Sequence, residues 1–145
     1  MERIILESIF ISSIIFLTFF YIRLFRNVVS LRRKNKISFG SGNKIKLERA
    51  IRAHANFIEN VPIGLILSMF LYFHNYLFFC CISNLLLLFG RVIHAKGISD
   101  INEKKNLFKL RIKGMKLTIY SYYASIIGLI CYLIQTFYFF NVNYI

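Results

Sequence analysis

The residues best suited to chemistry lie in one stretch, Leu47–Phe73. Within it Arg49, Arg52, Asn56 and Glu59 are spaced by 3, 4 and 3 positions, so on a helix they share one face. We call these four residues the polar stripe. Arginine forks bind carboxylates bidentately, and a carboxylate can hold an ammonium group. The stripe therefore predicts a site for a small polar ligand that carries carboxylates and an ammonium.

Two further clusters add polar groups of the same kind. In "GRVIHAKGI", Arg91 and His94 stand three apart and so are neighbours on a helix. In "FKLRIKGMKLT", Arg111, Met115 and Thr118 share a stripe. Taken alone, His94 is better explained as a satisfied histidine at the membrane interface. Together the groups would satisfy a tripeptide such as glutathione, whose peptide amide would meet the carboxamide of the polar stripe.

The elements that must position these residues are membrane spans. Of 145 residues, 57% are hydrophobic and sixteen are Phe. A helix crossing the bilayer needs about 20 mostly apolar residues, and a lone strand would leave its backbone unpaired in lipid. Four stretches qualify: Ile4–Phe25, Arg52–Phe73, Tyr76–Ala95 and Met115–Phe140. The sequence predicts an all-α integral membrane four-helix bundle, with residues 1–145 forming a single domain.

The positive charges predict how this bundle is oriented. The formal net charge is +13, and of 19 Lys and Arg only Arg3 falls on the side of the N-terminus, the "HNY" turn and the C-terminus. By the positive-inside rule both long loops are cytoplasmic, so the N-terminus and the C-terminus are expected on the non-cytoplasmic side. The lipid bilayer, including its anionic headgroups, is the expected partner, and no nucleic acid is expected.

Two other features have simple structural explanations. Cys80, Cys81 and Cys131 all stand in apolar runs without metal-binding spacing, so we expect small apolar packing residues and no metal site. The stretch "FGSGN" follows no strand and lacks the G-K-[ST] ending of a phosphate-binding loop, so it is expected to be a turn.

The quoted motifs resemble those of the MAPEG family, membrane-associated proteins in eicosanoid and glutathione metabolism. "ERAIRAHANFIENVP" resembles the family's second-helix pattern E-R-x-x-R-A-x-x-N-x-x-E-x-x-P. "GRVIHAKGI" is similar to its third-helix end at Arg91, His94 and Gly97. "LRRKNKISFGSGN" and "RIKGMKLT" resemble the small bacterial branch. The second-helix pattern is the most specific of these, and the resemblance covers all four spans.

The resemblance implies a homotrimer in the cell inner membrane, with glutathione bound between subunits near the cytoplasmic side. The glutathione-binding residues it implies are Arg52, Asn56, Glu59, Arg91 and His94. Arg111 would stabilise the thiolate of the bound glutathione, and Arg32 or Arg33 would correspond to a first-helix arginine that reaches the thiol. The implied activity is that of a glutathione transferase or peroxidase acting on a small lipophilic substrate, either an electrophile or a hydroperoxide.

Two departures from the family pattern leave turnover open. Ile98 stands where many eukaryotic members carry tyrosine, and Asn60 replaces an aromatic residue. An alternative is a non-catalytic protein in which the polar stripe only clasps a trimer through interhelical hydrogen bonds. A small transporter or channel is a third hypothesis, since intramembrane charges often mark transport paths, but no broken helix supports it.

Overall fold

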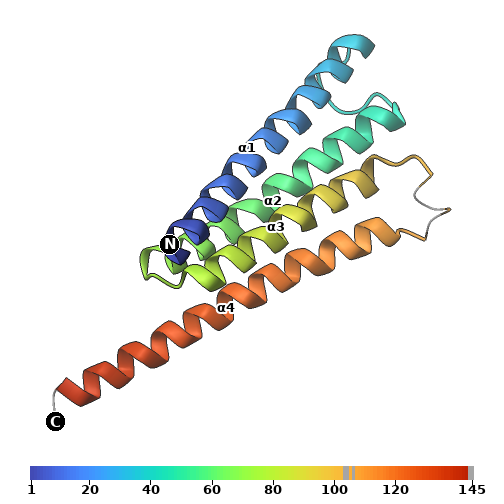
Figure 1. The fold of residues 1–145 in the computed structure, drawn as a ribbon. Coiled ribbons are helices and arrows are strands. Elements are labelled where there is room, and N and C mark those ends of the chain that lie inside the picture. Colours follow the sequence, from blue (N-terminus) through green and yellow to red (C-terminus); the bar gives the residue numbers. More distant parts are fainter. Residues whose placement is uncertain (103–104, 106, 144–145) are drawn as a thin grey trace.

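The computed structural model describes residues 1–102, 105 and 107–143, with side chains up to residue 140. These residues form four helices and no strand: α1 (Glu2–Asn35), α2 (Ile45–Phe73), α3 (Leu77–Ser99) and α4 (Lys109–Asn143) (Figure 1). Each helix is long and apolar enough to cross a membrane. The predicted all-α, four-span fold is therefore confirmed, whereas the side of the membrane on which the termini lie stays a prediction.

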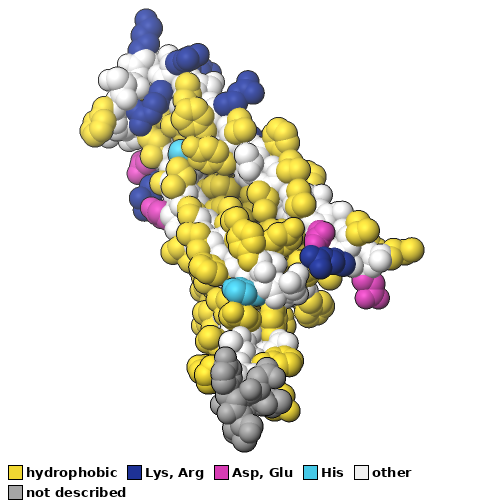
Figure 2. Space-filling model, turned by 90° about the vertical axis from the view of Figure 1, so that its left-hand side faces the viewer, with side chains coloured by type: hydrophobic (Ala, Val, Ile, Leu, Met, Phe, Trp, Pro, Cys, Tyr) yellow, Lys and Arg dark blue, Asp and Glu magenta, His cyan; other side chains and the backbone are white. Residues whose placement is uncertain are grey.

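The four helices run side by side, with both long loops at one end of the bundle (Figure 1). We call this end the loop end; the N-terminus lies at the other end, beside the α2–α3 turn. Figure 2 shows hydrophobic side chains over the middle of one face and Lys and Arg gathered towards one end. This separation of apolar and basic surface is what a bilayer and the positive-inside rule require.

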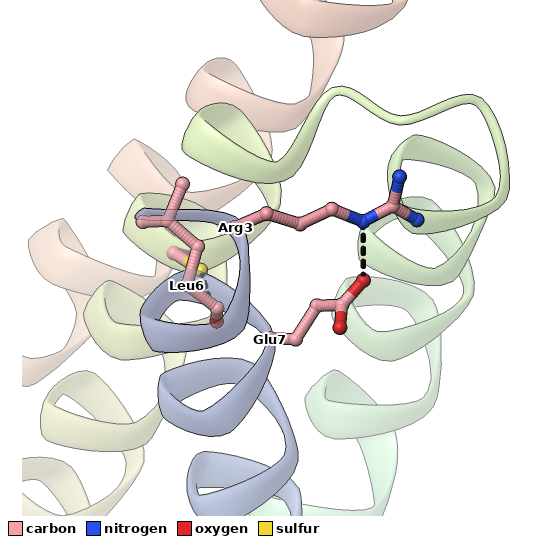
Figure 3. A network of polar contacts seen from close by, with 4 residues as sticks. Arg3, Leu6 and Glu7 are labelled. Carbon is pink, nitrogen blue, oxygen red and sulfur yellow. Dashed lines mark hydrogen bonds and ion pairs between the residues drawn. The ribbon is translucent and has the colours of Figure 1, made fainter. Parts of the chain in front are cut away.

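The N-terminal end has its own polar contacts. Arg3 Nε donates to Glu7 Oε1 over 2.9 Å, one helical turn along α1 (Figure 3). Next to this pair, the Leu6 carbonyl accepts a hydrogen bond of 3.0 Å from Cys81 Sγ on α3. The cysteine thiol thus joins α1 to α3, in keeping with a packing role.

The helices extend beyond the predicted spans at the loop end, into stretches that carry Lys and Arg. α1 runs ten residues past Phe25 and ends where Lys36 adopts a left-handed conformation (φ 54°), its N–H donating to the carbonyls of Arg32 and Arg33. Basic residues in the last turn also favour this helix end. α4 has 35 residues, and its C-terminal part projects past the other helices (Figure 1). The exposed large side chains of this part are mainly apolar or aromatic.

α3 is the central helix and contacts each of the other three. One buried cluster joins α1, α2 and α3 through Leu17, Phe57 and Leu87, and a second lies nearer the N-terminal end around Phe10 and Leu71. Half of the most apolar part of α3 is buried inside the bundle, more than in any other helix. Polar residues on α3 are therefore the ones most enclosed by protein.

α3 and α4 touch through glycines near the loop end. A Cβ added to Gly114 would lie 2.5 Å from the backbone nitrogen of His94, and one added to Gly97 would lie 2.8 Å from the backbone nitrogen of Arg111. Small residues allow such close backbone approach between membrane helices. The two contacts fix the start of α4 against the end of α3, and so fix the positions of the polar side chains that these segments carry.

Candidate functional site

A polar cavity of about 270 Å³ opens near the loop end, between α2 and the start of α4. Its lining residues are Ile45, Glu48, Arg49, Arg52, Asn56, Glu59, Ile98 and Arg111. The cavity brings together Arg52, Asn56 and Glu59 from α2 with Arg111 from α4, four of the residues singled out from the sequence. The polar stripe on α2 and one residue at the start of α4 therefore meet at a single cavity.

The polar stripe lies beside the packing face of α2. Ala53 and Phe57 are buried against α1 and α3, whereas Arg52 and Glu59 are exposed and Asn56 is half-buried. Within the part of the chain that the structure describes, neither Arg52 nor Glu59 forms a hydrogen bond or ion pair. Both charged groups are thus available to a ligand or to another subunit.

Arg91 lies directly behind the cavity and does not line it. Its side chain is only 1% exposed, and its Nη1 donates to Asn56 Oδ1 over 2.7 Å. Its Nη2 donates to Thr118 Oγ1 on α4. Because an arginine only donates, the carboxamide oxygen of Asn56 must face it. The amide nitrogen of Asn56 therefore remains as a donor for an acceptor in the cavity.

His94 lies outside the polar cavity. It is 4% exposed and borders a second hollow of about 460 Å³, whose other lining residues are Phe108, Arg111, Ile112 and Met115. The structure thus separates His94 from the polar stripe. Arg111 is the residue that borders both spaces, with the polar cavity on one side and a largely apolar hollow on the other.

Four lining residues are not among the site residues that the family resemblance implies, although one of them, Arg49, belongs to the polar stripe: Ile45, Glu48, Arg49 and Ile98. Arg49 Nη1 donates to the carbonyl of Ile98 over 2.7 Å, which joins the start of α2 to the end of α3. Glu48 adds a second carboxylate to the cavity. The sequence contains a pattern that indicates the two charged residues among them. Glu48 and Arg49 open the second-helix motif, and Glu48 stands four residues before Arg52.

The candidate first-helix arginines lie elsewhere. Arg32 Nη1 donates to the carbonyl of Ser38 within the α1–α2 loop over 3.0 Å, and neither Arg32 nor Arg33 lines the polar cavity of this chain. Gly40, Gly42 and Asn43 in that loop have positive φ, as a turn requires. The region predicted to be a turn between α1 and α2 is therefore confirmed as one.

The charges of the cavity favour an anion. Three arginines and two glutamates line it, so the formal charges leave one positive charge in excess. Among the described residues, no group of three or more His, Cys, Asp or Glu is placed to hold a metal ion. Guanidinium groups beside an apolar wall suit an organic anion whose carboxylates accept paired hydrogen bonds.

These features define a class: a four-helix integral membrane protein with an arginine-lined cavity near one end of its spans. The chain belongs to the MAPEG family, whose sequence profile matches residues 10–135. It is 32% identical over 93 residues to "Inner membrane protein YecN" of Escherichia coli strain K12, and equally to the protein of that name from E. coli O6:H1 strain CFT073. The alignment covers 63% of this chain and 67% of each relative. The resemblance stated from the motifs is thereby confirmed.

Proposed function

We propose that this protein binds glutathione in the polar cavity and uses it against lipophilic electrophiles or hydroperoxides. The observation that carries the proposal is the meeting of Arg52, Asn56 and Glu59 with Arg111 in one cavity of a chain that belongs to the MAPEG family. Glutathione offers two carboxylates, an ammonium group and peptide amides. Those groups match the guanidinium, carboxylate and carboxamide groups of the cavity.

The residues that we assign to glutathione binding have different parts in it. Arg52 pairs with a carboxylate, Glu59 with the ammonium, and the amide nitrogen of Asn56 donates to a peptide carbonyl. Arg91 acts through Asn56, because its Nη1 donates a hydrogen bond of 2.7 Å to the carboxamide oxygen of Asn56 and so orients the amide group. His94 acts from the neighbouring hollow that Arg111 also borders.

The same geometry supports a site shared between subunits of a homotrimer. The cavity of about 270 Å³ falls just below the 300–1,000 Å³ of typical ligand sites. Arg52 and Glu59 are exposed on a helix that crosses the membrane, where an unpaired charge costs several kcal/mol. A second copy of the chain would complete the cavity and cover these charges.

The chemistry follows from the position of Arg111. A thiol reacts as its thiolate, and a nearby cation lowers its pKa. In a transferase reaction the thiolate sulfur bonds to the electrophilic carbon, and the leaving group departs with the electron pair of the bond that breaks. In a peroxidase reaction two glutathione molecules form a disulfide while the hydroperoxide is reduced to an alcohol and water. The apolar hollow beside Arg111 would bring the lipophilic substrate next to the sulfur.

The proposed location is the inner, cytoplasmic membrane, with both loops in the cytoplasm, where glutathione is abundant. The name of the YecN relatives, the four apolar helices and the basic loop end support this location.

Calorimetry with glutathione tests the proposal most directly. The detergent-purified parent should bind glutathione, and Arg52→Ala should weaken binding at least tenfold, because a charged hydrogen-bonded contact contributes about 1.5–3 kcal/mol. Lys116→Ala is the matched control, since Lys116 is an exposed cation on α4 that does not line the cavity. Equal affinity of the parent and Arg52→Ala would exclude the assigned site.

The second candidate is a non-catalytic protein in which the polar stripe only holds a trimer together. The exposure of both Arg52 and Glu59 favours it. It predicts that Arg52→Ala or Glu59→Ala dissociates the trimer in detergent whether or not glutathione is present. Under the binding proposal, by contrast, an intact trimer loses only its ligand. Analytical ultracentrifugation of each variant with and without glutathione separates the two functions.

A further inference from the structure

An apolar groove of about 710 Å³ lies between α1 and α3. It shares no lining residue with the polar cavity and faces a different side of the bundle. Its walls are mainly aromatic and aliphatic, with Phe16 and Phe19 on α1 and Phe89 on α3. No acidic side chain lines it.

Each wall of the groove ends in a cation. On α1, Ser12, Phe16, Phe19 and Arg23 follow one another at spacings of 4, 3 and 4, and all four line the groove. Such residues form a continuous stripe on a helix. The side chain of Arg23 is exposed at the loop end of this stripe.

α3 repeats the pattern. Leu85, Phe89 and Val92 line the groove, and Lys96 stands four residues further on the same face and is exposed. α1 and α3 both run from the N-terminal end towards the loop end (Figure 1). Lys96 and Arg23 therefore both stand at the loop end of the groove, where their long apolar stems can reach along it while the charges approach the membrane surface.

We propose that this groove binds an anionic phospholipid, with an acyl chain between α1 and α3 and the phosphate beside Arg23 and Lys96. On α1 the groove is lined from Ser8 to Arg23, a distance of about 22 Å, which is most of the roughly 30 Å hydrocarbon core. This length accommodates one extended acyl chain whose headgroup lies at the loop end. Paired cations without an acidic neighbour in the groove select a negatively charged headgroup, as basic pockets between membrane helices do.

A tryptophan reporter tests the site, because the chain contains no Trp of its own. Phe89→Trp places the fluorophore in the groove wall. Ile119→Trp is the depth-matched control: a Cβ on Gly90 would lie 3.0 Å from the backbone nitrogen of Thr118, so residues 89 and 119 lie at the same depth. Ile119 is exposed and has Lys116 one turn away, so it also controls for a nearby cation without a groove.

Each reporter is reconstituted in phosphatidylcholine vesicles that contain a small fraction of brominated lipid, either phosphatidylglycerol or phosphatidylcholine. We expect brominated phosphatidylglycerol to quench Phe89→Trp with an apparent association constant on the order of tenfold above that of brominated phosphatidylcholine. Ile119→Trp should show little preference. Adding Arg23→Gln and Lys96→Gln to the Phe89→Trp reporter should reduce its preference to that of the control.

Three results would overturn the proposal. Equal quenching of Phe89→Trp by both lipids would mean that the groove meets bulk lipid without selecting a headgroup. A preference that survives the double neutralisation would show that these cations do not hold the phosphate. Quenching of Ile119→Trp but not of Phe89→Trp, by either lipid, would mean that another copy of the chain covers the groove. Circular dichroism and detergent size-exclusion profiles equal to those of the parent establish that each reporter variant is folded.

Discussion

Arg91 on α3 donates from its Nη1 to the side-chain oxygen of Asn56 on α2 over 2.7 Å, and this contact positions the polar stripe. The guanidinium is almost fully buried, and its other hydrogen-bond acceptors are the hydroxyl of Thr118 on α4 and, at 3.5 Å, the backbone carbonyl of Asn56. A single buried side chain thus joins three helices directly behind the polar cavity. Its Nε has no partner among the described residues, which makes the remaining contacts more important.

Loss of this contact should destabilise the fold. Asn56→Ala leaves a buried guanidinium with one acceptor fewer, and we expect a loss of about 1–3 kcal/mol. Thermal unfolding in detergent, followed by circular dichroism, measures it. Asn27→Ala, which removes an exposed asparagine of α1, is the control and should leave the melting temperature unchanged. Equal melting temperatures of the two variants would show that the contact contributes nothing to the stability of the fold.

Gly114→Ala should be far more damaging than Gly128→Ala. The new methyl group at position 114 would meet backbone atoms of His94 at 2.5 and 2.7 Å, so α3 and α4 must move apart. At position 128 the nearest atoms are Leu71 Cδ2, at the flexible end of its side chain, and Phe79 Cβ, both 2.8 Å away, so the contact is less close than at Gly114. We expect a loss of about 1–3 kcal/mol or more at Gly114, and a smaller one at Gly128. Thermal unfolding ranks the two variants, and the reverse order would contradict the backbone contact.

Arg111→Ala should spare glutathione binding but impair thiolate formation. Removing the cation raises the pKa of the bound thiol, by about one to three units on the scale of close charge pairs. The ultraviolet absorbance of the thiolate, titrated against pH with saturating glutathione, should therefore rise at higher pH in Arg111→Ala than in the parent.

Lys113→Ala is the control for this titration, because Lys113 is an exposed cation two residues away that does not border the cavity. Its thiolate curve should coincide with that of the parent. A parent curve that matches free glutathione would remove Arg111 from the proposed chemistry, even if binding itself is intact.

Glu7→Gln should have almost no effect on stability. The Arg3–Glu7 pair is well formed at 2.9 Å, but the Arg3 side chain is 68% exposed, and such pairs one turn apart contribute about 0.3–0.5 kcal/mol. Thermal unfolding of Glu7→Gln beside Asn56→Ala compares an exposed pair with a buried contact. A larger loss for Glu7→Gln would show that the membrane surface shields this pair from water.

The sequence predicted the parts of this protein that depend on local pattern. Apolar runs of sufficient length gave the four helices, and the 3-4-3 spacing brought Arg52, Asn56 and Glu59 to one cavity. Both features are properties of a single helix, so no knowledge of neighbouring helices was needed. Arg111 comes from a different helix and was singled out on its own stripe with Met115 and Thr118, whereas its role beside the thiol depended on the family resemblance.

The features of the site that the sequence did not predict depend on how the helices pack against one another. His94 and Arg91 stand three apart, yet Arg91 points to Asn56 while His94 borders the other hollow. The His94 backbone lies in close contact with Gly114 of α4, and no spacing within α3 predicts such a contact between helices. The helices also extend past the apolar runs, because hydrophobicity predicts the length of a membrane span and not the residue at which a helix ends.

The projecting end of α4 affects the membrane itself. Between Leu117 and Phe140 α4 carries no charged residue, a stretch of about 36 Å whose exposed side chains are mainly apolar or aromatic. This apolar length exceeds an ordinary bilayer core and creates a hydrophobic mismatch, which costs fractions of a kcal/mol per ångström unless the helix tilts or the lipids stretch. The stability of this protein should therefore depend on the thickness of the bilayer. Lipids with longer acyl chains should stabilise it more than short ones do.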